Sequence, residues 1–392
     1  MNFDLQRARR ETPGCENVVH FNNAGAALMP KRVVDSVVEY LQLEAQIGGY
    51  EAAESKKADV GRAYSAVAKM LSCSPSEIAI IENATRAWDM AFYSLNFQPG
   101  DRILTAKAEY ASNYIAFLQV AKRTGAKIEV IPDDESGQLS LSALENAIDK
   151  TVKLIAITHV PTNGGLVNPA VAVGKIARKA GVLYLLDACQ SIGQMPVDVN
   201  VVGCDILSAT GRKFLRAPRG TGFLYIRQDL IEQLEPPFLD LHAAEWTSTN
   251  DYRIRTDARR FENWETNYAG KLGLGVAVDY ALQWGLDRIQ SRVNILAQQL
   301  RDRLEEISNV MVQDLGKQRC GIVSFTVAGK DSLEIKQAFT ESKINVSVSP
   351  LKYTRLDMEN RGHQDFIRAS VHYYNSEEEI DYFCMTLASL LI

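Results

Sequence analysis

Short apolar runs that alternate with helical segments constrain the fold of this chain more than any other feature. Seven such runs occur in order: EIAII, DRILTA, KIEVI, KLIAIT, VLYLLD, DILSAT and GFLYI. Most of them are followed by a polar turn and an amphipathic segment of about ten residues or more. This alternation favours a mainly parallel sheet with helices on both faces. The sequence therefore predicts an α/β fold whose ligands bind at the carboxyl ends of the strands.

The remainder of the chain has a different pattern. Apolar residues at helical spacing predict one long helix from Leu272 to about Gln299. Beyond Asn309, four strand-like runs alternate with two helical segments, which predicts a small α+β C-terminal domain. At 392 residues, the chain is long enough for two domains.

Composition excludes several classes of function. The net charge is -5 and no basic run occurs, so neither nucleic acid nor a membrane surface is an expected partner. The N-terminus lacks an apolar segment and no apolar stretch reaches about 18 residues, so we expect a cytoplasmic protein. Six scattered cysteines form no CxxC pair and no His/Cys spacing, which predicts neither a metal site nor a disulfide framework.

Two charged residues follow neighbouring apolar runs. Asp187 ends a nearly all-apolar strand, where an ionised carboxylate is costly to bury without a cationic partner. Lys213 lies in the loop after the next strand. Taken singly, the aspartate is equally well a turn residue and the lysine a surface residue. Together, at adjacent strand ends, they form the pair that a pyridoxal phosphate site needs: an amine for the aldehyde and a carboxylate for the pyridine nitrogen.

Nearby residues supply the other parts of such a site. ENATRAW predicts a helix N-terminus at Ala84 and Thr85, where free backbone N–H groups favour a phosphate. Thr210 and Arg212, beside the lysine, would complete the phosphate site. Tyr110 is a candidate to stack on the pyridine ring, although a core tyrosine explains it as well.

These segments resemble the class V, cysteine-desulfurase-like family of aminotransferase-fold enzymes. The resemblance rests on six matches in order: FNNAGAALMP, ENATRAW, EYASN, LLDACQS with DILSATGRKFLRAPRGTGFLYI, RFENWETN and FIRASVHYYNSEEEID. It implies a type I fold of pyridoxal phosphate enzymes, with a seven-stranded, mainly parallel sheet. It also implies three parts: an N-terminal substrate loop (1–25), a large cofactor-binding domain (26–270), and a linking helix with a small C-terminal domain (271–392). Because RFENWETN matches the segment that approaches a neighbouring subunit, the resemblance implies a homodimer.

The resemblance also implies roles for individual residues. Lys213 would form the Schiff base, Asp187 would pair with the pyridine nitrogen, and Gln190 would donate to the ring hydroxyl. Arg368 would clamp the α-carboxylate of an amino-acid substrate in bidentate fashion. The implied catalytic residues are Lys213, Asp187 and Tyr110; the cofactor-binding residues are Ala84, Thr85, Tyr110, Thr162, Asp187, Gln190, Thr210, Arg212 and Lys213; the substrate-binding residues are Arg368, Asn23 and Ala24.

Three departures from the family bear on the reaction. Tyr110 stands where the family often has a stacking histidine, and Arg212 replaces the histidine before the lysine. The loop INVSVSPLKYTRLDM lacks the nucleophilic cysteine that takes sulfur in cysteine desulfurases. Cys320 begins a predicted strand, where we expect it to fill space. An ordinary desulfurase is therefore disfavoured.

The remaining candidates work without an enzyme thiol. The chain looks most like hercynylcysteine sulfoxide lyases and isopenicillin-N-epimerase-like proteins. This likeness predicts a C–S lyase that converts an S-substituted cysteine or its sulfoxide to pyruvate and ammonia, as in ergothioneine-type biosynthesis. An epimerase with a second acid, a transaminase, and a non-catalytic protein that keeps the fold are the alternatives. Intact Lys213 and Asp187 argue against the last of these.

Overall fold

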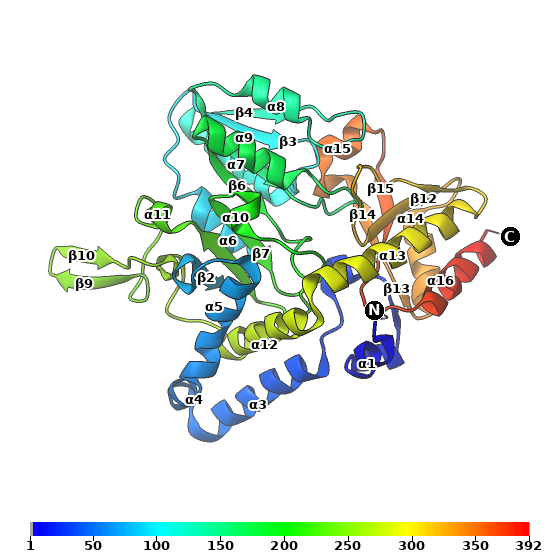
Figure 1. Ribbon diagram of the computed structural model, residues 1–392, viewed down its shortest axis with the longest axis horizontal. Helices are drawn as coiled ribbons and strands as arrows, with labels where there is room; N and C mark the ends of the chain where they lie inside the picture. The colour runs from blue at the N-terminus through cyan, green and yellow to red at the C-terminus, as the bar shows by residue number, and fades with distance from the viewer. Residues whose placement is uncertain (1–2, 392) are drawn as a thin grey trace.

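A seven-stranded sheet forms the centre of the computed structural model, which describes residues 3–391 (Figure 1). The strand order is β2-β8-β7-β6-β5-β3-β4. Strands β3 to β7 pair in parallel, whereas β8 runs antiparallel to both β7 and β2. The predicted α/β fold with a mainly parallel sheet is confirmed. The strands are β2 (Ile78–Ile81), β3 (Arg102–Ala106), β4 (Lys127–Ile131), β5 (Val152–Thr158), β6 (Leu183–Asp187), β7 (Ile206–Thr210) and β8 (Gly222–Ile226).

Helices cover the sheet on both faces because successive strand residues point to opposite sides. In β6, Leu185 joins one apolar core while its neighbours Tyr184 and Leu186 join another. The first core includes residues of α6 (Ala84–Phe92) and α7 (Ala111–Thr124). The second core includes residues of α5 (Lys57–Leu71), α8 (Leu141–Ala147), α9 (Ala170–Ala180) and α12 (Tyr268–Trp284).

The C-terminal part forms a smaller sheet of four antiparallel strands in the order β11-β12-β15-β14. Its elements are β11 (Val310–Val312), β12 (Ile322–Val327), α14 (Ser332–Glu341), β13 (Ile344–Asn345), β14 (Ser347–Pro350), η4 (Leu351–Tyr353), α15 (Arg355–Asn360), β15 (Asp365–Ser370) and α16 (Glu377–Ser389). The N-terminal strand β1 (Val19–His20) pairs with β13. The N-terminal segment therefore packs against the C-terminal unit, and both chain ends lie on this side of the molecule (Figure 1). The division into 1–25, 26–270 and 271–392 stays a proposal.

The single long helix predicted from Leu272 to Gln299 is wrong. The structure has two helices, α12 and α13 (Leu286–Glu305), separated by Gly285. The φ of Gly285 is 83°, and its N–H donates to the carbonyl groups of Ala281 and Leu282. Glycine adopts this left-handed backbone at little cost and commonly ends helices in this way. Apolar spacing continues across the break, which concealed it in the sequence.

Several short elements were not predicted from the sequence. A hairpin, β9 (Ala244–Ser248) with β10 (Asp251–Ile254), projects from the body at the left of Figure 1. Within residues 3–391, none of the helices is long and apolar enough to span a bilayer. The other elements are α1 (Leu5–Arg10), η1 (Pro13–Glu16), α2 (Asn23–Ala26), α3 (Lys31–Ile47), α4 (Gly49–Ser55), η2 (Pro75–Glu77), α10 (Val199–Val202), α11 (Gln228–Ile231) and η3 (Ala258–Phe261).

Candidate active site

One cavity lies at the carboxyl ends of β5, β6 and β7 and at the N-terminus of α6. Every residue predicted to bind the cofactor lines it: Ala84, Thr85, Tyr110, Thr162, Asp187, Gln190, Thr210, Arg212 and Lys213. The position agrees with the general location of ligand sites in parallel sheets. Sequence reasoning missed five further lining residues: Asn83, Asn113, Thr158, Val160 and Cys189.

Lys213 lies in a loop that is fixed by hydrogen bonds on both sides. Its carbonyl accepts from the backbone N–H of Arg216 at 2.9 Å, and Gly211 donates to the carbonyl of Thr221 at 2.9 Å. Arg216 is itself buried, has a φ of 63°, and donates from its guanidinium to Thr12 Oγ1 at 2.6 Å. The loop after β7 is thereby tied to the N-terminal segment.

Desolvation sets the protonation of Lys213. Burial lowers the pKa of its ammonium to about 8; repulsion by Arg212 adds to the fall and attraction to Asp187 opposes it. An amine with a pKa near the working pH is available both as a nucleophile and as a proton carrier. An ordinary surface lysine would not show this shift.

Asp187 presents a buried carboxylate to the cavity. Its Oδ1 accepts from the backbone N–H of Cys189 at 2.9 Å, and its Oδ2 accepts from Asn113 Nδ2 at 3.0 Å. The residue is 5% exposed and ends the central strand β6. A buried carboxylate that receives only neutral donors is suited to bind a cationic ligand atom.

Gln190 leaves a polar atom unpaired in the same cavity. Its Nε2 donates to the carbonyl of Ala24 at 3.1 Å and to Thr162 Oγ1 at 3.4 Å. Among the described residues, its Oε1 has no hydrogen-bond partner. Because an unpaired buried oxygen costs free energy, this atom marks a place for a ligand group.

The N-terminus of α6 faces the cavity through Ala84 and Thr85. Asn83 caps this helix, with its side chain accepting the N–H of the third residue beyond it at 2.9 Å. The other first-turn N–H groups are oriented for an anion. Arg212 lines the cavity but its guanidinium donates to the carbonyl of Gly25, so it also fixes the N-terminal segment.

Arg368 lies on β15 of the small sheet and reaches toward the cavity. Its Nη1 donates to Thr162 at 2.7 Å (carbonyl) and 2.9 Å (Oγ1), and its Nη2 to Asn22 Oδ1 at 3.5 Å. Its Nε has no partner among residues 3–391. Desolvation lowers the pKa of the guanidinium to about 10, at which it remains charged at neutral pH. A buried cation with an open donor favours an anionic group of a ligand.

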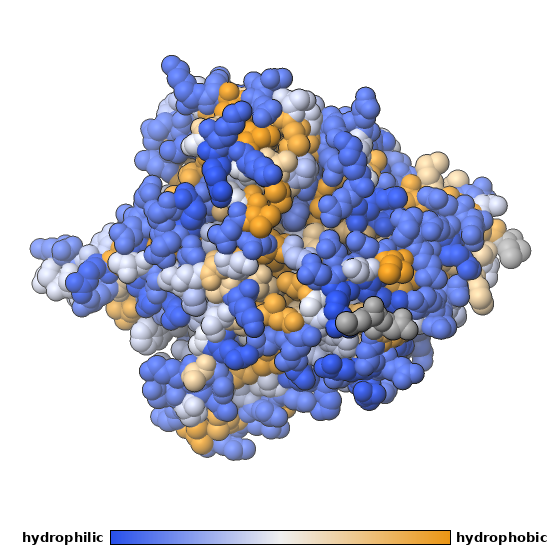
Figure 2. Space-filling view, viewed as in Figure 1, coloured by the Kyte–Doolittle hydropathy of each residue, from blue (hydrophilic) through white to orange (hydrophobic). Residues whose placement is uncertain are grey.

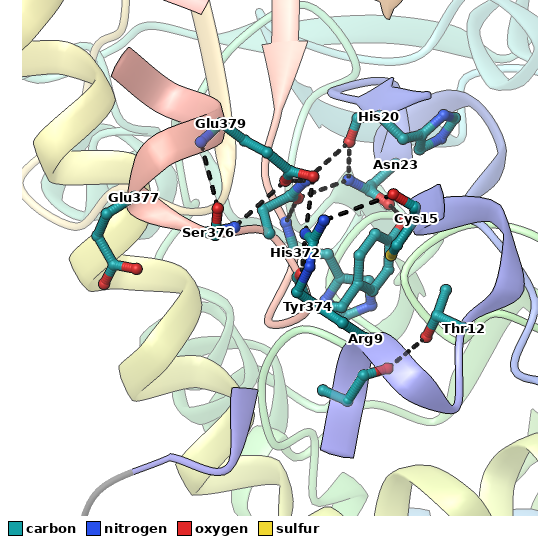
Figure 3. Close-up of polar contacts among 12 residues, drawn as sticks. Arg9, Thr12, Cys15, His20, Asn23, His372, Tyr374, Ser376, Glu377 and Glu379 are labelled. Atoms are coloured by element: carbon teal, nitrogen blue, oxygen red, sulfur yellow. Dashed lines mark hydrogen bonds and ion pairs between the residues drawn. The ribbon is translucent and has the colours of Figure 1, made fainter. Parts of the chain in front are cut away.

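Asn23 and Ala24 differ in how they relate to the cavity. The Asn23 side chain donates to the carbonyl groups of Ser370 at 2.7 Å and His20 at 3.2 Å, and accepts from the Tyr374 hydroxyl. Figure 3 shows this side chain inside a polar network between the N-terminal segment and the C-terminal unit. Ala24 approaches the cavity through its bond to Gln190. Their substrate-binding roles stay predictions.

The cysteines are distributed as follows. The segment 344–360, which contains β13, β14, η4 and α15, has no cysteine. Cys320 is fully buried in the core, and desolvation raises the pKa of its thiol to about 12. Cys189 lines the cavity, where burial raises its pKa well above the usual range. A thiol in that state is a poor nucleophile at neutral pH.

The donor set fits the predicted cofactor. Lys213 offers an amine for an aldehyde, Asp187 a carboxylate for a ring nitrogen, and the start of α6 a row of N–H groups for a phosphate. Gln190 Oε1 supplies one further unpaired polar atom.

Comparison with known proteins shows the family to which the chain belongs. Residues 19–383 match the family described as Aminotransferase class-V. A probable cysteine desulfurase of Methanothermobacter thermautotrophicus is 30% identical over 97% of both chains. One of Pyrococcus abyssi is 29% identical over 98% of this chain and 96% of its own. The apo structure of a cysteine desulfurase from Thermococcus onnurineus NA1 has a TM-score of 0.92 at 28% identity, covering 100% of this chain and 98% of that one. These relatives are named desulfurases rather than hercynylcysteine sulfoxide lyases.

Proposed function

This chain belongs to the class-V aminotransferase family, and we propose that it is a C–S lyase. Within that family it is a pyridoxal-phosphate enzyme of the group of cysteine desulfurases and C–S lyases. Its substrate would be an S-substituted cysteine or its sulfoxide, and its products pyruvate and ammonia. One observation carries the proposal: Lys213 and Asp187 line one cavity, and Arg368 reaches it through its bonds to Thr162. This arrangement gives a base, a partner for the ring, and a cation for the substrate carboxylate.

We propose the following roles for the chain's own residues. When bound, the cofactor supplies a protonated ring that accepts the electron pair released at the substrate Cα. Asp187 would hold the proton on the ring nitrogen, and Tyr110 would pack against the ring. Lys213 would hold the aldehyde carbon through Nζ until the substrate amine takes its place, and the freed Nζ would then take the proton from Cα. The first turn of α6 binds the phosphate.

Arg368 would hold the substrate by its α-carboxylate. The guanidinium is fixed by Thr162 and by Asn22, which leaves Nε free to donate. A substrate held in this way has its Cα–H bond in one orientation toward Lys213, so that the bond to be broken is selected by geometry. The position of Arg368 therefore favours amino-acid substrates with a free carboxylate.

The sulfur step separates two candidate reactions. In the lyase, the Cα proton goes to Lys213, the Cβ–S bond breaks with its electron pair on sulfur, and water converts the organic product to pyruvate and ammonia. In a desulfurase, an enzyme thiolate takes the sulfur and alanine is released. The names of the relatives favour the second reaction. The cysteine-free segment 344–360 and the raised pKa of Cys189 favour the first.

The proposal is tested by supplying the loaded enzyme with S-alkylcysteine sulfoxides, S-alkylcysteines and cysteine sulfinate, and measuring pyruvate. Release of pyruvate with a change in cofactor absorbance supports the lyase. A loaded enzyme that shows the absorbance change but releases no pyruvate from any of them contradicts it, and alternative products would then identify an epimerase or a transaminase.

The lowered pKa of Lys213 predicts how cofactor loading depends on pH. Below about 8 the amine is protonated and cannot attack an aldehyde, so the loading rate should rise with pH and level off above 8. An unperturbed lysine would still show a rising rate well beyond that point. The measurement is the rate of absorbance change after mixing apo-protein with pyridoxal phosphate across pH values that bracket 8. A rate that keeps rising in proportion to hydroxide concentration would contradict the shifted pKa.

We also propose that the enzyme is a homodimer. Residues 261–263 and 265–267, which belong to the RFENWETN segment, line a second cavity, and Glu262 in this segment forms an ion pair with Lys271 at 3.0 Å. On α3, the side chains of Val34, Val38 and Leu41 are 38%, 44% and 52% exposed. Figure 2 shows apolar surface over α3 and α4 at the bottom of the view. Exposed apolar patches of this kind are typical of protein interfaces and support the proposal.

A further inference from the structure

A second buried carboxylate, Glu109, lies beside Asp187 and has no part in the roles assigned above. It lies in the turn between β3 and α7, one residue before the helix cap Tyr110, and is 4% exposed. Its Oε1 accepts from the N–H of Tyr110 at 2.8 Å, and its Oε2 from the N–H of Thr158 at 3.0 Å and from Thr105 Oγ1 at 3.1 Å. Such a set of neutral donors holds the Glu109 side chain in one orientation between β3, β5 and α7.

Asn113 joins the two carboxyl groups. Its Nδ2 lies 2.9 Å from Glu109 Oε1 and 3.0 Å from Asp187 Oδ2. A side-chain amide nitrogen carries two hydrogens, so it can donate one to each carboxyl group. The reverse amide orientation would place Oδ1 against two carboxylate oxygens, which electrostatics disfavours. Asn113 is 3% exposed and lies in the first turn of α7, four residues after Glu109.

The hydrogen bonds from Asn113 to Glu109 and Asp187 form a bridge between the two carboxyl groups. This bridge decides which lone pairs of the Asp187 carboxylate stay unpaired. Its Oδ1 is held by Cys189 and its Oδ2 by Asn113, which leaves the remaining lone pairs directed to the cavity that Asp187 lines. We propose that Glu109 is a positioning residue that acts through Asn113 to orient Asp187 toward the ring nitrogen of the cofactor. This inference rests on the role proposed for Asp187.

Charge adds to the geometric effect. Burial raises the pKa of Glu109 to about 7, and repulsion by Asp187 adds to the rise, whereas the hydrogen bonds from Thr158 and Asn113 oppose it. Because the two carboxylates repel each other, a cation bound at Asp187 relieves that repulsion. The Glu109–Asn113 bridge should therefore favour a protonated ring over a neutral one.

The test is a titration of apo-protein with pyridoxal phosphate, read as the dissociation constant and as the absorption maximum of the bound cofactor. Glu109→Gln keeps the shape but removes the charge and turns one acceptor into a donor facing Thr158. We expect the dissociation constant to rise about tenfold, which corresponds to ~1.4 kcal/mol, with a shifted absorption maximum. Asn113→Ala should have a similar effect, and the double variant should be no worse than the more affected single variant, because one bridge is broken in all three.

Glu379→Gln is the matched control. Glu379 is also buried and accepts a hydrogen bond from an asparagine amide four residues away, Asn375 Nδ2, at 2.8 Å, but it lies on α16 outside the cavity. The Glu379→Gln variant should leave the dissociation constant of pyridoxal phosphate unchanged, even if it lowers the melting temperature of the apo-protein. Additive effects of Glu109→Gln and Asn113→Ala, or lowered melting temperatures with an unchanged dissociation constant, would overturn the inference.

Asp187→Ala in the same titration separates the inference from the role on which it rests. If the dissociation constant rises in Asp187→Ala but stays unchanged in Glu109→Gln and Asn113→Ala, the bridge alone is refuted. An unchanged dissociation constant in Asp187→Ala would refute the role of Asp187, and the bridge with it. Should Glu109→Gln fail to fold, Asn113→Ala still tests the bridge: an unchanged dissociation constant refutes it, and a rise of about tenfold with a shifted absorption maximum supports it.

Discussion

Replacing Lys213 with alanine is expected to lower kcat by about 10⁴-fold while the protein stays folded. In the roles proposed above, Lys213 is both the amine that attaches the cofactor and the group that takes the Cα proton, so the variant would lose both. Folding should be retained, because removing a buried ammonium relieves the desolvation that lowers its pKa to about 8. Pyruvate release measures the loss of activity. Reduction of the loaded protein with borohydride, followed by mass determination, shows whether the cofactor is attached to the chain.

A surface lysine provides the control for this variant. Lys317 forms an exposed ion pair with Asp134 at 2.9 Å, and Lys317→Ala should keep both turnover and attachment of the cofactor. Covalent attachment in Lys213→Ala, or turnover within tenfold of the unmodified enzyme, would show that another amine performs these steps.

The second large effect is expected from Arg368→Ala. Loss of the buried guanidinium should lower kcat/KM by about 100-fold or more for substrates that carry an α-carboxylate, because a buried charge partner is removed. Cofactor binding should change less than kcat/KM, because the loss of Arg368 disturbs Thr162 but leaves Lys213, Asp187 and the α6 turn in place. Steady-state kinetics and a cofactor titration measure the two quantities separately.

Arg361→Ala is a suitable comparison for Arg368→Ala. Arg361 is a partly buried arginine of the same unit, and its Nη2 donates to the carbonyl of Gln313 at 2.6 Å. Its replacement also removes a hydrogen bond, so melting temperatures are measured for both variants. If the two variants show the same kcat/KM, or if Arg368→Ala retains the kcat/KM of the unmodified enzyme, the carboxylate role of Arg368 is wrong.

The main sheet could be predicted from the sequence because its signals are local. Each strand is a short apolar run bounded by polar turns, and ligand-binding side chains follow directly after the strands, as Asp187 and Thr210 do. The carboxyl ends of parallel strands lie at one edge of the sheet, so the fold brings the residues that follow them together. This explains why Asp187 and Thr210 line one cavity; Thr162 and Gln190, which line it too, were predicted from the resemblance to the family.

Other features depend on contacts between distant segments, which local patterns do not contain. Asn113 reaches Asp187 from a helix 74 residues earlier in the chain, and only its spacing of four from Glu109 hinted at a shared face. The direction of the Asn23 side chain is decided by Ser370 and Tyr374 in the C-terminal unit. The break at Gly285 was missed because both helices pack into the same core, so their apolar spacing continues.

The fate of sulfur distinguishes a lyase from a desulfurase, and the products formed from cysteine and from an S-alkylcysteine sulfoxide report it. We would measure pyruvate, ammonia and alanine released by the loaded enzyme and by Cys189→Ala, since Cys189 lines the cavity. A lyase releases pyruvate and ammonia in equal amounts with alanine at background, and Cys189→Ala leaves this pattern unchanged. Alanine as the main product, with sulfur retained on the protein, would contradict the proposed reaction.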